Sequence, residues 1–396
     1  MRILFCNYEY PPLGGGGGII NALLAEELAR RHEVVVLTSG NSSLPSENEM
    51  SGVRIIRVPV FFRRQFAAAN FPSMLAYLPM GIIAGKQLIL KNEPFDLINT
   101  HFVLPSGPVG NALARFSGIP NVLSLHGGDL YDPSKWTSPH RHGLLRAWIR
   151  SLLKKADRIV GQSRNTLQNA RDYYVPNLQA SLIPLGIKRP AAECISRQQF
   201  GFNDKDVLIA TVGRLIARKA VDQLISLLKD LNSEHVHILI IGSGPLEEAL
   251  RKKAIELQIG AQVHFLGYVK EADKFGILQM SDLFVSTSQH EGFGLVFLEA
   301  MACGLPIICY DHGGQIDFLE NERTGYVVTL NDRAVLTAYC QALVGDAQSR
   351  KRMGAENKRR VEEFFIDSCA ARYEDLFGEV IEAFKNGHAY GHSHRS

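Results

Sequence analysis

The sequence predicts an α/β protein of two domains, each built on a parallel β-sheet. Three observations support this prediction. At 396 residues the chain exceeds one ordinary domain and fits two of about 180 to 200 residues. Short apolar runs typical of buried strands alternate with longer helical stretches, which is the pattern of parallel sheets. Glycine-rich or polar loops follow several of these runs, at the sheet edge where such proteins bind ligands.

The first domain is expected over residues 1–187, the second over 188–367, and a final helix with a His-containing tail over 368–396. Residues 183–190 are the expected linker. The predicted strands are 2–6, 34–38, 53–58, 96–99, 121–125, 158–160, 206–212, 238–241, 282–285 and 306–310, with a further strand and its loop over 263–269. The main predicted helices are 20–30, 79–90, 295–303 and 368–385. The apolar stretch 74–85 contains Pro79, is short for a membrane span, and is expected to be a buried helix.

Five consecutive glycines, residues 14–18, separate the first strand from the first helix. A strand, a glycine loop and a helix together let a phosphate approach the backbone. The spacing is not G-x-G-x-x-G, and the next strand ends without the acid that binds a ribose, so a dinucleotide site is disfavoured. The absence of Gly-Lys-Ser/Thr excludes a P-loop.

Polar residues follow two further strands. The strand 121–125 delivers His126, Gly127, Gly128 and Asp129 at its C-terminal end, so His126 is a candidate ligand-binding residue. The strand 206–212 is followed by Arg214 and Lys219. Cations at this edge suit a diphosphate leaving group on which negative charge builds up.

The segment 286–299 joins a strand to a helix and carries two glutamates. Gly292 and Gly294 leave the backbone bare where the helix begins, so its first N–H groups can face an anion. Glu291 precedes this point, and Glu299 lies about two turns into the helix. Two carboxylates therefore flank one anion site and can accept hydrogen bonds from sugar hydroxyls.

These two glutamates around Gly292-Phe293-Gly294, followed by the Ala-Met-Ala-Cys-Gly-Leu-Pro of residues 300–306, resemble the signature of family 4 glycosyltransferases, part of the group 1 glycosyl transferases. The resemblance spans nearly the whole chain. It implies the GT-B fold, in which two Rossmann-like domains face each other across a cleft. It also implies that the C-terminal helix crosses back to the first domain.

The resemblance implies a role for each candidate residue. Glu291 would contact the donor sugar, Glu299 would hold the ribose hydroxyls, and His126 would contact the hydroxyls of the donor. Arg214 and Lys219 would stabilise the departing diphosphate in place of a metal ion; Ala220 stands where the family usually has glycine. The remaining donor-binding residues implied by the family pattern are Gly15, Gly16, Gly242, Gly244, Leu266, Phe293, Gly294 and Leu295.

No metal and no cofactor are expected, with a UDP-type or GDP-type sugar as substrate. Asp204-Lys205-Asp206 forms the D-x-D triplet of metal-dependent glycosyltransferases with the other large fold. It precedes the first strand of the second domain, at the wrong end for a ligand, so we interpret it as a turn. The tail histidines at 388–394 are interpreted as part of a disordered end.

The net charge of +3 conceals an asymmetry. Residues 1–190 contain 21 Lys and Arg against 12 Asp and Glu, whereas the rest contains 22 against 28. Basic residues gather in 61–66 and 141–155. The second of these segments fits either a core-facing helix with a solvated basic face or a helix that contacts an anionic membrane. Without a recognition motif beside these charges, nucleic-acid binding is disfavoured.

The six cysteines are scattered, and no signal peptide precedes the first strand, so a cytoplasmic protein is expected, peripheral on the inner face of the plasma membrane if the basic domain binds lipid. The predicted function is retaining, metal-independent transfer of a hexose-type sugar from a nucleotide sugar to a glycan or lipid-linked acceptor. The basic first domain would bind the acceptor. A GT-B nucleotide-sugar epimerase and a non-catalytic binding protein remain as alternatives.

Overall fold

The structure is a computed structural model that describes residues 1–61, 71–91, 93–190 and 195–387. The chain divides into unit 1, Met1–Ile187 with Phe365–Ser396, and unit 2, Lys188–Phe364. The expected second boundary lay at 367/368, whereas the chain re-enters unit 1 at Phe365, where it pairs with Ile187 in an isolated bridge. The basic residues at 62–66, Cys194 and the tail histidines lie outside the described residues.

Unit 1 is an eight-stranded sheet in the order β3-β4-β2-β1-β5-β6-β7-β8. Every neighbouring pair is parallel except β3 and β4. The strands are β1 (Arg2–Asn7), β2 (Glu33–Gly40), β3 (Glu47–Met50), β4 (Val53–Pro59), β5 (Leu97–His101), β6 (Asn121–Leu125), β7 (Arg158–Gly161) and β8 (Ser181–Leu182). The edge strands β3 and β8 were not predicted, because β3 is polar and β8 has only two residues.

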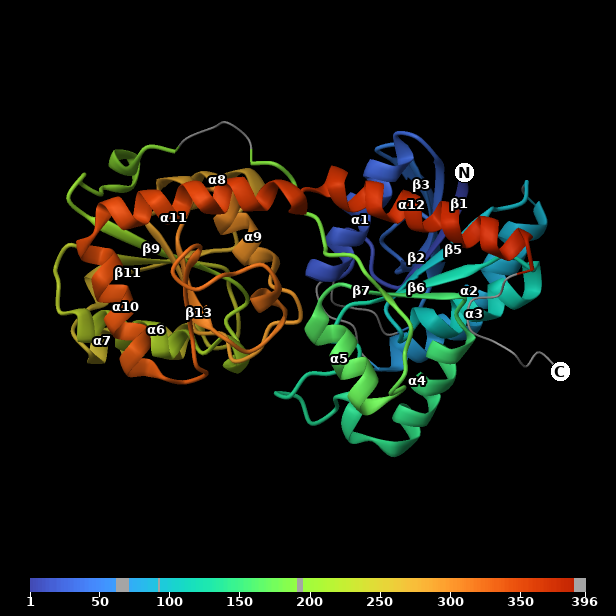
Figure 1. The fold of residues 1–396 in the computed structure, drawn as a ribbon, viewed down its shortest axis with the longest axis horizontal. Coiled ribbons are helices and arrows are strands. Elements are labelled where there is room, and N and C mark those ends of the chain that lie inside the picture. Colours follow the sequence, from blue (N-terminus) through green and yellow to red (C-terminus); the bar gives the residue numbers. More distant parts are fainter. Residues whose placement is uncertain (62–70, 92, 191–194, 388–396) are drawn as a thin grey trace. The chain divides into compact units, whose positions relative to one another are not determined.

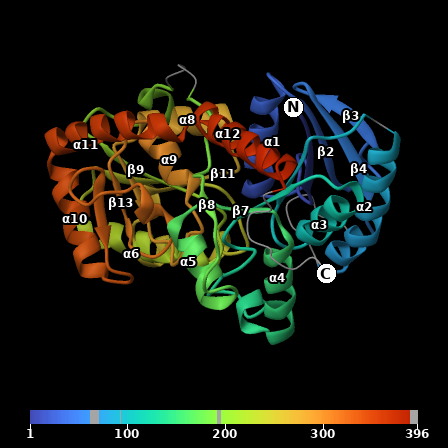
Figure 2. The same ribbon diagram turned by 45° about the vertical axis from the view of Figure 1, so that its right-hand side comes forward.

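Helices cover both faces of this sheet. Successive residues of β1 point to opposite faces, and because all of residues 3–6 are apolar, each face contributes to a core. Ile3 and Phe5 face a core shared with α1 (Gly16–Ala29) and α12 (Ile366–Lys385), which lie side by side (Figure 1). Leu4 and Cys6 face the other core, with α2 (Phe71–Lys91) and α3 (Ser106–Ser117), which are adjacent in Figure 2. Helices α4 (Gly143–Lys155) and α5 (Arg164–Tyr173) cover β6 and β7.

Unit 2 is a fully parallel sheet in the order β11-β10-β9-β12-β13-β14. Its strands are β9 (Val207–Val212), β10 (Val236–Ile241), β11 (Val263–Gly267), β12 (Leu283–Ser286), β13 (Ile307–Tyr310) and β14 (Gly325–Val328). The helices are α6 (Val221–Leu231), α7 (Glu247–Glu256), α8 (Glu271–Met280), α9 (Leu295–Ala302), α10 (Arg333–Gly345) and α11 (Ala347–Arg360). The predicted two-domain α/β class is confirmed.

Strand order reverses once in each sheet, between β1 and β5 in unit 1 and between β9 and β12 in unit 2. Open α/β sheets bind ligands at such switch points, beyond the carboxyl ends of the strands. The loops after β1, β5, β9 and β12 are therefore the first places to examine. They contain the glycine run, Phe102, Lys219 and Glu291.

Two expectations about helices were wrong. Helix α1 begins at Gly16 and not near residue 20, so only the first two glycines of the run precede it. Helix α2 is not buried: 28% of its most apolar window is inside the protein, although its length and composition meet the criterion for a membrane span. One face packs on α3, with Gly81 against Val109 and Gly85 against Leu113.

Candidate active site

The loops that follow β9 and β10 in unit 2 cross each other closely. The N–H of Gly213 donates to Ile241 O at 2.9 Å, and that of Leu215 donates to Ser243 O at 3.0 Å. A Cβ on Gly242 would lie 2.1 Å from Gly213 O, and one on Gly244 would lie 2.4 Å from Leu215 O. Only glycine permits this approach, so these predicted donor-binding glycines also fix the loop that carries Arg214 and Lys219.

Lys219 forms an ion pair with the buried Glu291 at the switch point of unit 2. Lys219 Nζ donates to Glu291 Oε1, and Arg218 Nη1 lies 3.4 Å from Glu291 Oε2. Arg218 also donates to the carbonyl of His290. The sequence analysis missed Arg218, although its place beside Lys219 in a basic loop was visible. Arg214 is exposed in the same loop and is not one of the two cations paired with Glu291.

The charge of Glu291 is stabilised despite its burial. Burial alone raises the pKa of this carboxyl group, but the attraction of Lys219 and Arg218 and the hydrogen bonds from Lys219 and Ser288 outweigh it. The pKa of Glu291 therefore lies below its ordinary value. At neutral pH Glu291 is a carboxylate that accepts hydrogen bonds, already paired with two cations.

Backbone contacts hold these two loops together. Gln289 N donates to Arg218 O at 2.8 Å, and Thr287 Oγ1 donates to Ala220 O at 2.9 Å. Ala220 has φ 44°, in the left-handed region that favours glycine. Ala220, which stands where the family usually has glycine, thus keeps the backbone conformation that glycine adopts most easily. With alanine at this position, Lys219 still reaches Glu291.

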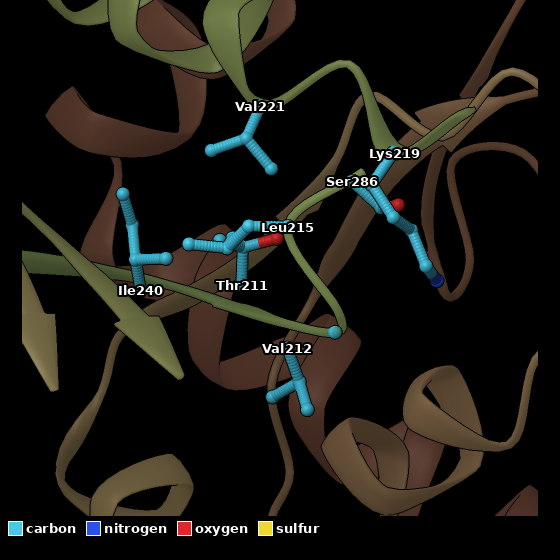
Figure 3. A pocket seen from close by; sticks show the side chains of 8 residues that line it. Thr211, Val212, Leu215, Lys219, Val221, Ile240 and Ser286 are labelled. Atoms are coloured by element: carbon cyan, nitrogen blue, oxygen red, sulfur yellow. The ribbon is translucent and has the colours of Figure 1, made fainter. Parts of the chain in front are cut away.

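A small pocket lies at the C-terminal end of β9 (Figure 3). Figure 3 shows Lys219 extending past Ser286, with its Nζ pointing away from the apolar side chains. The pocket is lined by Thr211, Val212, Gly213, Leu215, Lys219, Val221, Ile240 and Ser286. The apolar part supports the stem of Lys219, while its charged end lies outside the apolar side chains and is paired with Glu291.

Helix α9 begins next to Glu291 with bare backbone. Gly294 is its N-cap with φ 93°, and a side chain there would clash with Phe297. Within the described residues, the N–H groups of Leu295 and Val296 have no acceptor. Phe293 is 3% exposed and its ring packs on Phe318 at 5.3 Å, so it can offer a ligand only its backbone. This start of a helix suits an anion.

Glu299 lies further along α9 and retains one unused oxygen. Lys274 Nζ, which the sequence analysis did not predict, donates to Glu299 Oε1 at 2.7 Å. Glu299 Oε2 is buried and has no partner in the described residues. Burial raises the pKa of Glu299, and Lys274 only partly opposes this effect. A buried acceptor without a donor is costly, so this atom fits the hydroxyl group of a ligand.

On β11, Leu266 is half-buried beside Gly267, which accepts from Gly242 N at 2.7 Å.

In unit 1, His126 is buried where β6 ends. Its backbone N–H donates to Asp129 Oδ1 at 3.1 Å, and Asp129 Oδ2 accepts from Val103 N at 2.7 Å. Burial raises the pKa of Asp129 to about 6 and lowers that of His126 to about 3. The loop thus holds a neutral imidazole, and not an imidazolium, at the sheet edge.

Phe102 connects His126 to the glycine run, a contact that the sequence did not predict. Its ring stacks on His126 at 4.2 Å between centroids. A Cβ on Gly17 would lie 2.5 Å from the Phe102 ring, so Gly17 is the glycine that this packing requires. The predicted Gly15 and Gly16 have open space at the Cβ position, and Gly15 N donates to Glu9 Oε2 at 3.1 Å. The backbone at Gly15 and Gly16 is therefore accessible from the side-chain direction.

The D-x-D triplet forms a turn, as predicted. Asp206 Oδ2 accepts from Asn203 N at 2.8 Å, before β9 and at the opposite end of the strand from Lys219. In the described parts of the chain, no group of three or more His, Cys, Asp or Glu side chains is placed to hold a metal ion.

Comparisons with known proteins agree with this architecture. The family profile described as "Glycosyltransferase Family 4" matches residues 14–189, and "Glycosyl transferases group 1" matches residues 194–360. The chain is 25% identical over 394 residues to N-acetyl-alpha-D-glucosaminyl L-malate synthase of Bacillus anthracis, with 96% of this chain and 97% of the relative covered. It is 29% identical over 397 residues to a glycogen synthase of Mycobacterium tuberculosis, with 95% and 94% covered.

Solved structures share the fold. Sucrose-phosphate synthase of Thermosynechococcus elongatus has a TM-score of 0.83 at 24% identity, with 97% of this chain and 100% of that chain covered. Anabaena HepE in complex with UDP-glucose has a TM-score of 0.75 at 19% identity, with 96% and 100% covered. The two profiles together span both units, and the likeness to these structures covers nearly the whole chain. The chain is therefore a glycosyltransferase of family 4, with the GT-B fold.

Proposed function

We propose that this protein is a retaining glycosyltransferase that moves a hexose-type sugar from a UDP-sugar or GDP-sugar to a glycan or lipid-linked acceptor, in the synthesis of cell-surface polysaccharide or glycolipid. One observation carries the proposal. At the switch point of unit 2, Lys219 lies in the loop that also carries the exposed Arg214, and it is paired with the buried Glu291 of a second loop, beside the first N–H groups of α9, which have no acceptor in the described residues. This arrangement suits a diphosphate next to a sugar.

The chemistry follows from these charges. As the bond between sugar and diphosphate breaks, negative charge grows on the leaving oxygen. Lys219, Arg214 and the first N–H groups of α9 would stabilise that charge, which is usually the largest contribution to such catalysis. The acceptor hydroxyl would attack from the same face, losing its proton to the departing phosphate. Glu291 would then hold the sugar and would not form a covalent bond to it, because its two oxygens are already paired with cations.

Glu299 and His126 would bind the rest of the donor. The unpartnered Oε2 of Glu299 would accept a hydrogen bond from a ribose hydroxyl. The turns at Gly242, Gly244 and Leu266 would border the base, largely through backbone. His126 would contact a sugar hydroxyl, and the remainder of unit 1 would bind the acceptor. We propose that these residues act without a metal ion.

Binding of nucleoside diphosphates tests this proposal. We expect one of UDP, GDP and ADP to raise the thermal melting temperature of the purified protein equally with and without chelator. A ligand at about a hundred times its dissociation constant contributes roughly 2.7 kcal/mol. NAD serves as the control ligand. A response to NAD alone, or to none of the three diphosphates, would contradict the donor site, and a shift abolished by chelator would contradict metal independence.

Two other activities would give different products. A nucleotide-sugar epimerase would convert the donor without any acceptor, which chromatography of the donor after incubation would reveal. A non-catalytic binding protein would bind the nucleotide and leave the donor intact with every acceptor tried. The charged cluster at Lys219 favours transfer, because a binding protein has no leaving group to stabilise.

We propose further that this protein is a cytoplasmic enzyme and that unit 1 binds the inner surface of the plasma membrane. Two basic segments were candidates for this contact. Residues 62–66 lie outside the described residues, and the other segment, α4, faces the core. Its Ile149, Leu152 and Leu153 are buried, while Arg146 and Arg150 donate to the carbonyls of Tyr173 and Tyr174. Helix α2 instead exposes an apolar row made of Phe71, Leu75, Ile83 and Leu90, each at least 45% exposed. An apolar row on the basic half of the chain suits an anionic lipid surface.

Vesicle flotation tests this surface. We expect the protein to float with phosphatidylglycerol vesicles and much less with phosphatidylcholine vesicles. Changing Leu75 and Ile83 together to serine should weaken binding by roughly tenfold or more, because each loses an apolar side chain worth about 1.5–3 kcal/mol when buried. Ile255→Ser, at a side chain 70% exposed in unit 2, is the matched control. Equal binding by all variants would exclude α2 as the contact.

A further inference from the structure

Three polar side chains of unit 1 form a hydrogen-bonded row that ends at His126. Asn99 Nδ2 lies 2.9 Å from His101 Nε2, and His101 Nδ1 lies 3.0 Å from His126 Nε2. Asn99 and His101 are two residues apart on β5, so the pleat places them on one face. His126 follows β6, the neighbouring strand. The row therefore crosses two strands and reaches the ligand-binding edge of the sheet.

Aromatic packing fixes the orientation of both rings. His101 is 1% exposed; it stacks on Phe5 at 5.5 Å and lies 6.2 Å from the ring of Tyr373 on α12. The hydroxyl of Tyr373 is hydrogen-bonded to Ser124 at 3.0 Å, which holds that ring in turn. Phe102 stacks on His126. Neither imidazole can turn over without disturbing this packing, so each ring nitrogen has a defined neighbour.

The row determines where the protons lie. An amide nitrogen only donates, so Asn99 Nδ2 makes His101 Nε2 an acceptor. A neutral imidazole that accepts at Nε2 carries its proton on Nδ1, and His101 therefore donates to His126 Nε2. His126 must then carry its own proton on Nδ1. Burial keeps both rings neutral, since it lowers the pKa of His101 well below its ordinary value and that of His126 to about 3.

Two details indicate that the row serves a purpose beyond packing. Asn99 is fully buried, and within the described residues its Oδ1 has no hydrogen-bond partner, so the hydrogen bond seen for this amide is the one to His101. Burying an amide for a single hydrogen bond is unfavourable compared with an apolar side chain of similar size. His126 keeps 8% of its surface exposed, and no group in the described residues accepts a hydrogen bond from its Nδ1.

We propose that Asn99 and His101 are positioning residues that fix His126 in the Nδ1–H tautomer. His126 then offers a hydrogen-bond donor, and not a base, to a sugar hydroxyl of the nucleotide-sugar donor. The sugar contact rests on the proposed function, whereas the tautomer is a property of the ligand-free protein. Reading the tautomer and the ligand affinity separately keeps failure of one distinct from failure of the other.

Proton–nitrogen correlation NMR of histidine-labelled protein tests the tautomer directly. We expect His101 and His126 each to show a protonated Nδ1 and an unprotonated Nε2 near neutral pH. A protonated Nε2 on His126 in the unaltered protein would overturn the proposal. That measurement needs no variant, so the proposal stays testable even if a buried substitution prevents folding.

Variants test whether the hydrogen-bonded row sets the tautomer of His126. Asn99→Leu removes the donor that orients His101, and we expect the His126 signals to become those of a mixture of tautomers, although Asn99 does not contact His126. Asn121→Leu is the matched control: Asn121 is also buried, on β6, and bonds Thr100 and Asn111 instead of a histidine. In the single variant His101→Asn, His126 should keep its Nδ1–H form, because the amide nitrogen of the new asparagine can donate to His126 Nε2 in place of the His101 Nδ1–H. An unchanged His126 tautomer in Asn99→Leu would show that Asn99 does not set this tautomer through His101.

Affinity tests the consequence. With UDP-glucose and GDP-mannose as probes, Asn99→Leu should weaken binding of the nucleotide sugar that the protein accepts by roughly two- to twelvefold, the effect of one hydrogen bond. Binding of the matching nucleoside diphosphate should not change. Equal weakening of both ligands would overturn the sugar contact. If neither sugar binds while the NMR result stands, the proposed donor fails and the tautomer assignment survives.

Discussion

Replacing Lys219 by methionine should lower the rate of sugar transfer by about a hundred- to a thousandfold. This is the usual loss when one group that stabilises a developing negative charge is removed. The reason is local: Lys219 Nζ is the cation bonded to Glu291 at the switch point of unit 2. Steady-state kinetics would measure the loss. Lys252→Met removes a lysine with 79% side-chain exposure and should leave the rate unchanged.

The same variant should be less stable, with a defined pH dependence. Glu291 would remain buried with only the longer contact to Arg218 and the hydrogen bond from Ser288, and breaking a buried ion pair costs about 3–5 kcal/mol. Because the pKa of Glu291 lies below its ordinary value in the folded protein, its stabilising effect is present above the unfolded pKa and is lost as pH falls through the folded pKa. Denaturation curves should therefore show the largest difference at neutral pH and little in acid.

A double variant separates stability from catalysis. Lys219→Met with Glu291→Gln replaces the buried carboxylate that has lost its main partner by a neutral amide, so we expect much of the lost stability to return. Transfer should remain low, because the cation is still missing. Recovery of activity in the double variant would show that Lys219 serves only to neutralise Glu291, and the assigned role at the diphosphate would be wrong.

Glu299→Ala should weaken binding of the nucleoside diphosphate by roughly ten- to a hundredfold, with a smaller effect on the turnover of bound donor. A hydrogen bond to a charged group contributes about 1.5–3 kcal/mol, and Oε2 of Glu299 has no other partner among the residues that the structure describes. Calorimetry with the diphosphate, beside turnover at saturating donor, would separate the two effects. Glu256→Ala, at an exposed pair with Lys252, is the control. Unchanged affinity for the diphosphate would remove Glu299 from the ribose site.

Local patterns in the sequence predicted most of the secondary structure. The buried strands of both sheets are continuous apolar runs because helices cover both faces, and such runs are recognisable without neighbours. The stop of α9 followed from Gly304, which has φ 77°. The start of α1 was misplaced because glycine normally weakens a helix, whereas here packing of Phe102 at Gly17 favours glycine inside it.

The exposed row on α2 shows the limit of composition. An apolar stretch indicates burial on average, but only the packing of neighbours decides which face is covered. Gly81 and Gly85 let α3 approach one side closely, and no described element covers Leu75 and Ile83 on the other. The sequence alone could not distinguish a helix buried all round from one with a free apolar face.

By itself the sequence determined the family, the two-domain α/β class and the candidate residues Lys219, Glu291, Glu299 and His126, because these depend on residue types at short, fixed spacings. The tertiary structure alone decided which side chains meet. Arg218 contacts Glu291, Lys274 contacts Glu299, and Asn99 and His101 hold His126. Apart from Asn99 and His101, which share β5, the residues that meet come from separate loops, helices or strands. Strand order in the sheet brings them together, and no local pattern in a single sequence records that order.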